Sequence, residues 1–191
     1  MIQRIHGKAA WVLLAGAGLI VGVIAGAVSL FGDVGSAQSV RVRDGDVVVV
    51  TGSVDEALAE ASRRAGFSIV APAAGSMSGV RLEGVLIPAP PPPGPPGSPP
   101  RTFRVVTLDF AVGDTNLQLD ETNEEVDPSF AGDEMPAGLP GARLFRESTD
   151  GGTTYSLLVG QRGFLLGIPR GANVSESVAL ELLRRTAAKL K

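Results

Sequence analysis

The sequence predicts an α+β protein in which one N-terminal transmembrane helix is followed by an antiparallel sheet domain of about six to eight strands with two packed helices. Three observations predict it. Residues 9–31 are 23 consecutive positions without a charge. Most of the later chain alternates apolar and polar residues in short runs bounded by Gly, Asp and Pro, as half-buried strands do. Residues 54–65 and 176–190 instead space their apolar side chains as helices do.

The uncharged run at residues 9–31 predicts a single-pass protein of the cell membrane. At about 1.5 Å per residue, a helix of that length covers the roughly 30 Å hydrocarbon core of a bilayer. Arg4 and Lys8 precede the run, so the positive-inside rule makes residues 1–8 a cytoplasmic tail and residues 32–191 an extracytoplasmic domain. A cleaved signal peptide is the alternative, although the run is longer than the roughly 7–15 apolar residues usual in one.

Gly18, Gly22 and Gly26 recur at every fourth position of this run. Small residues at that spacing let two helix backbones approach closely, so one interpretation is a helix-pairing face through which two copies form a homodimer. The alternative is compositional, because the chain contains 25 glycines.

The exported domain is predicted to begin with a hairpin. Asp44-Gly45 lies between β-branched runs and supplies the residues that a tight turn needs. Ser53 and Glu56 then form a capping box for a helix over 54–65, and Gly66 suits the left-handed position beyond its end.

The next predicted elements are two strands and a proline-rich segment. Residues 67–72 are predicted to form a short strand, and residues 80–87 a longer one in which Gly84 is a bulge. Residues 88–100 contain nine prolines and are expected to adopt polyproline II structure. This segment could separate two domains, but we interpret it as a loop within one, because neither side is large enough to close a core.

The second half of the domain is predicted to be mostly antiparallel strands. A hairpin turns at Gly113-Asp114, and an acidic loop over 120–136 follows. The remaining predicted strands are 142–146, 153–159 and 164–168. A final amphipathic helix over 176–190 is expected to begin near Asn173 or Ser175, and its basic residues at the C-terminal end suit the helix dipole.

The order of these elements resembles an uncharacterised exported bacterial domain found in anti-sigma-factor-like and other single-pass envelope proteins. Residues 56–72 (EALAEASRRAGFSIVAP) carry the resemblance most directly, and the patterns at 106–119, 155–168 and 175–190 extend it. The resemblance implies the fold and an envelope location, and it suggests a sensing or regulatory task.

Composition argues against several activities. Without Arg4 and Lys8, the chain has 15 basic and 20 acidic residues, a net charge of −5 that disfavours a nucleic-acid partner. It has no cysteine, and its one histidine, His6, lies in the predicted cytoplasmic tail. We therefore predict no catalytic, cofactor-binding or metal-binding residues and no enzyme activity.

Carboxylates are the remaining chemical groups. Residues 109–134 hold nine acids and no Lys or Arg, and a hard cation such as Ca²⁺ binds oxygen ligands of this kind. The spacing follows no known loop signature, so we interpret the region as a solvated acidic loop. The acids are Asp109, Asp114, Asp120, Glu121, Glu124, Glu125, Asp127, Asp133 and Glu134.

We therefore expect a membrane-anchored, non-catalytic exported module of the bacterial envelope with a binding or a sensing and regulatory role. Its partner would be an unidentified protein, peptide or lipid. The alternatives are a structural or assembly subunit of an envelope or secretion complex, and an envelope enzyme that uses acidic residues.

Overall fold

The computed structural model describes residues 39–88, 105–123 and 132–190. All the described residues belong to the second of two units, which begins at Ser36. The predicted cytoplasmic tail and the uncharged run at 9–31 lie outside the described residues, as do Gly18, Gly22 and Gly26.

The predicted hairpin and first helix are confirmed. Strands β1 (Val40–Asp44) and β2 (Val47–Thr51) pair antiparallel around a turn at Gly45, whose φ is 57°. Helix α2 spans Val54–Ala65. Ser53 caps α2 as predicted, since its Oγ accepts a hydrogen bond from the Glu56 N–H at 3.2 Å. Glu56 also reaches back, but its Oε2 accepts from the Gly52 N–H at 2.9 Å, one residue before the cap.

The remaining elements continue the sheet and add one helix. They are β3 (Val80–Ile87), β4 (Val105–Val112), β5 (Thr115–Thr122), β6 (Asp133–Met135), β7 (Ala142–Thr149), β8 (Gly152–Val159), β9 (Arg162–Pro169) and α3 (Glu176–Ala187). The register between β3 and β4 shifts between Leu82 and Gly84, so the predicted bulge is present. Ser175 caps α3.

The predicted antiparallel sheet of six to eight strands is wrong. The described residues form one nine-stranded mixed sheet in the order β2-β1-β3-β4-β5-β9-β8-β7-β6. Strand β3 pairs parallel with β1, because the chain leaves β2, runs through α2 and returns beside β1. A helical connection of this kind is what a parallel neighbour requires. Strand β6, at one end of this order, is formed by Asp133–Met135, which were expected to lie in the acidic loop.

The strand predicted at residues 67–72 is also wrong. Residues 67–72 belong to no sheet. Its backbone groups bond to side chains instead of a neighbouring strand: the Ile69 N–H donates to Ser62 Oγ at 2.8 Å, and the Ser68 carbonyl accepts from Arg162 at 2.8 Å. Side-chain partners of this kind satisfy an extended backbone without a ladder.

The predicted membrane-spanning helix has no counterpart in the described part of the chain. Within residues 39–88, 105–123 and 132–190, no helix is both long and apolar enough to cross a membrane. The longest helices there, α2 and α3, have 12 residues each.

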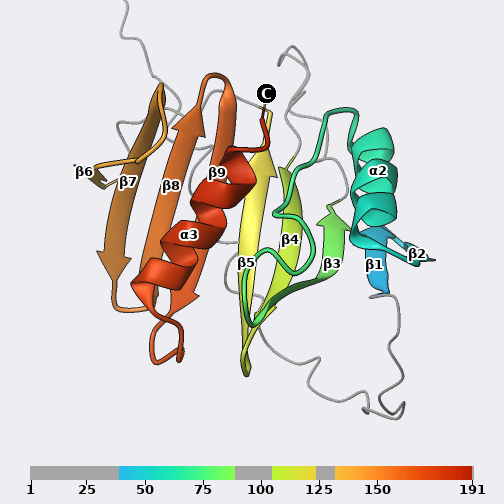
Figure 1. The fold of residues 1–191 in the computed structure, drawn as a ribbon, viewed down its shortest axis with the longest axis horizontal. Coiled ribbons are helices and arrows are strands. Elements are labelled where there is room, and N and C mark those ends of the chain that lie inside the picture. Colours follow the sequence, from blue (N-terminus) through green and yellow to red (C-terminus); the bar gives the residue numbers. More distant parts are fainter. Residues whose placement is uncertain (1–38, 89–104, 124–131, 191) are drawn as a thin grey trace, which may run out of the picture. The chain divides into compact units, whose positions relative to one another are not determined.

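The core lies on one face of the sheet, beneath both helices. Figure 1 shows α2 and α3 on the same face, with the segment between α2 and β3 passing between them. Helix α2 packs on β1 and β3, and α3 packs on β8 and β9. Alternate residues of the central strands, among them Leu108, Leu119 and Leu166, are fully buried on that face.

Candidate functional site

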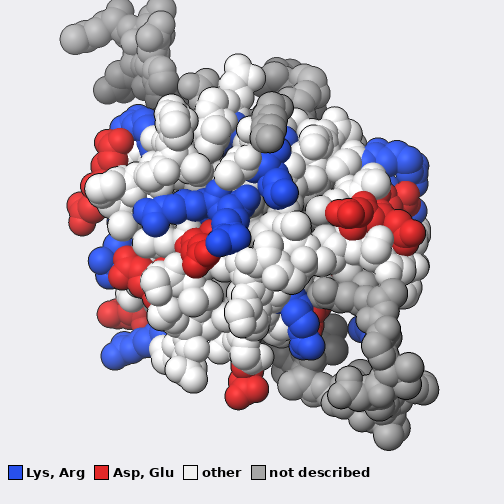
Figure 2. Space-filling view, in the orientation of Figure 1, with Lys and Arg blue, Asp and Glu red and all other residues white. Residues whose placement is uncertain are grey.

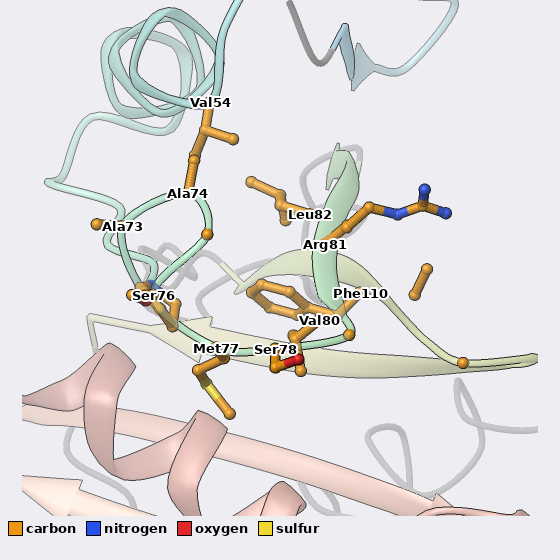
Figure 3. A pocket seen from close by; sticks show the side chains of 15 residues that line it. Val54, Ala73, Ala74, Ser76, Met77, Ser78, Val80, Arg81, Leu82 and Phe110 are labelled. Atoms are coloured by element: carbon orange, nitrogen blue, oxygen red, sulfur yellow. The ribbon is translucent and has the colours of Figure 1, made fainter. Parts of the chain in front are cut away.

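A cavity of about 570 Å³ opens beside the start of α2. Its apolar walls come from three elements: Val54 begins α2, Leu82 lies on β3 and Phe110 lies on β4. Figure 3 shows these three side chains converging on the cavity, whereas the guanidinium of Arg81 points away from it. The fourth wall is the segment of residues 72–79, which we call the ridge.

The ridge is shaped by its small residues. Two turns fold it, closed by hydrogen bonds from the Ser76 N–H to the Ala73 carbonyl at 3.0 Å and from the Val80 N–H to the Met77 carbonyl at 3.3 Å. Gly75 has φ 71°, a conformation that other residues rarely adopt. Because the ridge side chains other than that of Met77 are short, they leave the space that becomes the cavity.

A second hollow of about 480 Å³ lies on the other side of the ridge. Pro72, Ala73 and Ser76 line both hollows, so the ridge separates two halves of one surface groove. The far wall of the second hollow is the end of α3, where Arg185 and Lys189 contribute to the lining. Arg185 holds the ridge in place by donating to the Ser76 carbonyl at 3.1 Å.

The end of α3 carries a basic cluster, which we define as Arg184, Arg185 and Lys189. Figure 2 shows Lys and Arg gathered on this face where α3 lies. Arg185 pairs with Glu181 at 2.7 Å, and Arg184 donates to the Ala137 carbonyl at 2.7 Å. The whole chain has a net charge of −3, so this cluster is locally opposite in sign to the protein. An anionic ligand group is therefore favoured in the second hollow.

The segment that leads into the ridge is fastened to the sheet by a buried carboxyl group. Glu121 on β5 is 0% exposed. One of its oxygens lies 2.8 Å from Arg162 Nη2, and the carboxyl also accepts the Val70 N–H at 3.2 Å. The Arg162 guanidinium stacks over the Phe67 ring at 4.8 Å from its centre. These contacts fix the entry of the ridge without placing a charged group in either hollow.

Burial dominates the ionisation of Glu121. It raises the pKa of Glu121 to about 8, although the charge of Arg162 and the hydrogen bond from Val70 act in the lowering direction. Glu121 lies outside the residues that line the two hollows, so we assign it to positioning the ridge.

Where the structure describes the predicted acidic loop, its acids other than Asp114 lie in strands β4, β5 and β6. Asp109 and Asp120 lie on adjacent strands, on the face away from the helices, and are not in a solvated loop. Burial raises the pKa of both; Gln118 donates to Asp109 at 3.1 Å, and Thr107 donates to Asp120 at 2.5 Å. Among the residues that the structure describes, no group of three or more His, Cys, Asp or Glu could hold a metal ion. Glu124, Glu125 and Asp127 lie outside that part of the chain.

Sequence reasoning missed the groove. It noted the basic residues of the final helix only as complements to the helix dipole, and it assigned no structure to residues 73–79. The run Ala-Ala-Gly-Ser-Met-Ser-Gly was the available signal, because six of its seven residues are small and leave little side-chain volume to fill space. The Glu121–Arg162 contact joins residues 41 positions apart, and no local pattern indicates it.

The cavity beside α2 has an almost uncharged lining. Apart from Arg81, its lining residues are uncharged, and none is Asp, Glu, His, Lys or Cys, so the lining supplies no usual general base. Comparisons with protein-family models, with curated proteins and with solved structures found no match.

Proposed function

We propose that this chain is an exported, non-catalytic binding module of the bacterial envelope, located at the cell membrane with residues 32–191 outside the cytoplasm. Its ligand is an extended peptide segment that carries an apolar side chain next to an acidic one. The observation that carries the proposal is the groove, in which an apolar cavity and a hollow with basic residues lie on the two sides of one ridge.

The groove fits one side chain at each side of the ridge. A cavity of about 570 Å³ with walls from Val54, Leu82 and Phe110 has room for a large apolar side chain. The second hollow offers Lys189 to a carboxylate, and Arg185, which also bonds to Glu181 and Ser76, adds positive charge to its wall.

The location rests on the sequence. The 23 uncharged residues at 9–31 support delivery to the membrane, and Arg4 and Lys8 before them support a cytoplasmic N-terminus. A reporter enzyme fused after Lys191 should be active only outside the cytoplasm, and activity inside would contradict this location.

Selection from a random peptide library on the full-length chain in mild detergent tests the ligand. We expect enriched peptides to carry an apolar residue beside Asp or Glu. Fluorescence anisotropy with a labelled selected peptide should show about tenfold weaker binding for Ala74→Trp, which narrows the cavity, and for Lys189→Glu, which reverses a charge in the second hollow.

The matched control is Arg170→Glu, an exposed charge reversal in the turn after β9, which should leave affinity unchanged. Peptides without an acidic preference, or equal affinity for the control and Lys189→Glu, would contradict the proposal. Displacement of the peptide by a labelled fatty acid would identify the ligand as a lipid and would also overturn it.

A further inference from the structure

The two edges of the nine-stranded sheet differ in how they meet solvent. Strand β6 ends one edge with only three residues, and its Glu134 forms an ion pair with Arg143 at 3.0 Å. Strand β2 ends the other edge with the sequence Val-Val-Val-Val-Thr, which holds no charge. Short strands and charges protect an edge from pairing with another chain, so β6 is protected and β2 is not.

The valines of β2 are exposed. Val47, Val48 and Val50 expose 50%, 55% and 63% of their surface, and they are the large apolar residues most open to solvent among those the structure describes. Val49 is half-buried and packs against the rim of the core. β-Branched residues on an open edge form favourable cross-strand pairs when another strand is added.

The turn between β1 and β2 determines which backbone groups point outward. Asp44 and Val47 flank a two-residue turn, so they form a hydrogen-bonded pair. In an antiparallel ladder, bonded and non-bonded pairs alternate. Val47, Val49 and Thr51 therefore bond to β1, while the N–H and carbonyl groups of Val48 and Val50 point away from the sheet.

The strand is self-complementary about Val49. If two copies pair antiparallel with a two-fold axis at Val49, Val48 of one copy faces Val50 of the other, and Val47 faces Thr51, which has nearly the same shape. Val48 and Val50 have the outward backbone groups, so Val48 of each copy can form a hydrogen-bonded pair with Val50 of the other. No like charges meet, as they would if two β6 strands paired.

We propose that the β2 edge is a self-association surface through which two copies of this chain join their sheets in an antiparallel pair centred on Val49. The interface is one strand wide, so the dimer is weak and reversible. It uses a different surface from the peptide groove and does not depend on it. Its closed two-fold symmetry requires only one patch on each copy.

The absence of cysteine from the chain permits a direct test. In the proposed pair, the two Val49 residues form the central non-bonded pair, in which Cα atoms lie about 4.5 Å apart. This separation allows a disulfide. The full-length Val49→Cys chain in mild detergent should therefore crosslink to itself under mild oxidation, at least tenfold faster than Glu134→Cys on the opposite edge.

A second substitution in the Val49→Cys background tests the register. Val50→Pro removes an outward N–H and keeps the ladder to β1, so it should reduce crosslinking to the rate of Glu134→Cys. Val50→Thr keeps the N–H and should crosslink normally. Urea unfolding followed by circular dichroism verifies that each variant is folded. Equal crosslinking in the Val49→Cys and Glu134→Cys chains, or crosslinking that Val50→Pro leaves unchanged, would overturn the proposal.

Discussion

Glu121 Oε2 lies 2.8 Å from Arg162 Nη2, and this contact joins β5 to β9 while the Glu121 side chain is fully buried. Arg162 is more open, with 17% of its side chain exposed. Both residues also bind the backbone of the segment after α2, at Val70 and Ser68. One buried contact therefore fastens the sheet and the entry of the ridge together.

The free energy of unfolding should depend on pH through the ionisation of Glu121. Its pKa is raised from 4.5 to about 8, so the folded protein keeps a proton that the unfolded chain releases above pH 4.5. The free energy of unfolding should therefore be highest below about pH 4.5 with respect to this group, and should fall as pH rises to about 8.

Urea unfolding between pH 5 and pH 9 measures this dependence. Asp109 and Asp120 also have raised pKa values and contribute in the same direction, so the comparison must be with Glu121→Gln. This variant should lose most of the slope between pH 6 and pH 8. An unchanged slope would show that another group is responsible.

Replacement of Arg162 should be more harmful at high pH. Arg162 lowers the pKa of Glu121, so Arg162→Met raises that pKa further. Above pH 8 the folded variant must then either bind a proton at Glu121 or bury an unpaired carboxylate, so the loss of unfolding free energy should grow with pH towards about 3–5 kcal/mol. At pH 6 Glu121 holds its proton, and the loss should be about 1–3 kcal/mol, that of a buried hydrogen bond. Arg143→Met is the control, because it breaks an exposed ion pair expected to contribute about 0–1 kcal/mol. Equal losses for Arg162→Met at both pH values would argue against the raised pKa.

The cap of α2 should contribute measurably to stability. Ser53→Ala removes the acceptor of the Glu56 N–H and should lower the free energy of unfolding by about 1 kcal/mol. Ser78→Ala, at an exposed position of the ridge, should change it by less than about 0.5 kcal/mol. Thermal unfolding of the two variants side by side distinguishes the cap from a general effect of losing a hydroxyl group.

Replacement by alanine should destabilise the protein to different extents at Gly152, where β8 begins, and at Gly160, in the turn after β8. Gly152 has φ 146°, and a Cβ atom there would overlap the Ile168 carbonyl, so Gly152→Ala should cost more than about 2 kcal/mol. Gly160 has φ 59° with open space around it, and Gly160→Ala should cost about 1 kcal/mol from backbone conformation alone. Chemical denaturation provides both values, and a reversed order would contradict the geometry.

Local signals predicted local structure well. The cap of α2 at Ser53, the left-handed Gly66 and the bulge at Gly84 each depend on residues within a few positions, and each is present. Most later strands also began and ended near the predicted residues, because alternation and turn residues are read along the chain itself.

Contacts between residues far apart in the sequence could not be predicted from local patterns. The segment at 67–72 has the composition of a strand, but Ser62, Glu121 and Arg162 satisfy its backbone, and two of these lie more than 40 residues away. The parallel pairing of β1 with β3 depends on where α2 returns the chain. The groove depends on the side-chain contacts of residues 67–72 and on the parallel pairing of β3. Together they hold the ridge between α2 and α3.

The junction between β5 and β9 also affects how the domain forms during synthesis. Residues 118–122 find their second neighbour only in residues 163–167, near the end of the chain. A nascent chain that has not yet reached Arg162 therefore presents β5 as an open edge. The apolar side chains of β5 also lack their neighbours on β9 until that strand has been made. Closure of the domain is consequently a late step, and a chain truncated before β9 should be degraded by added protease much faster than the full-length chain.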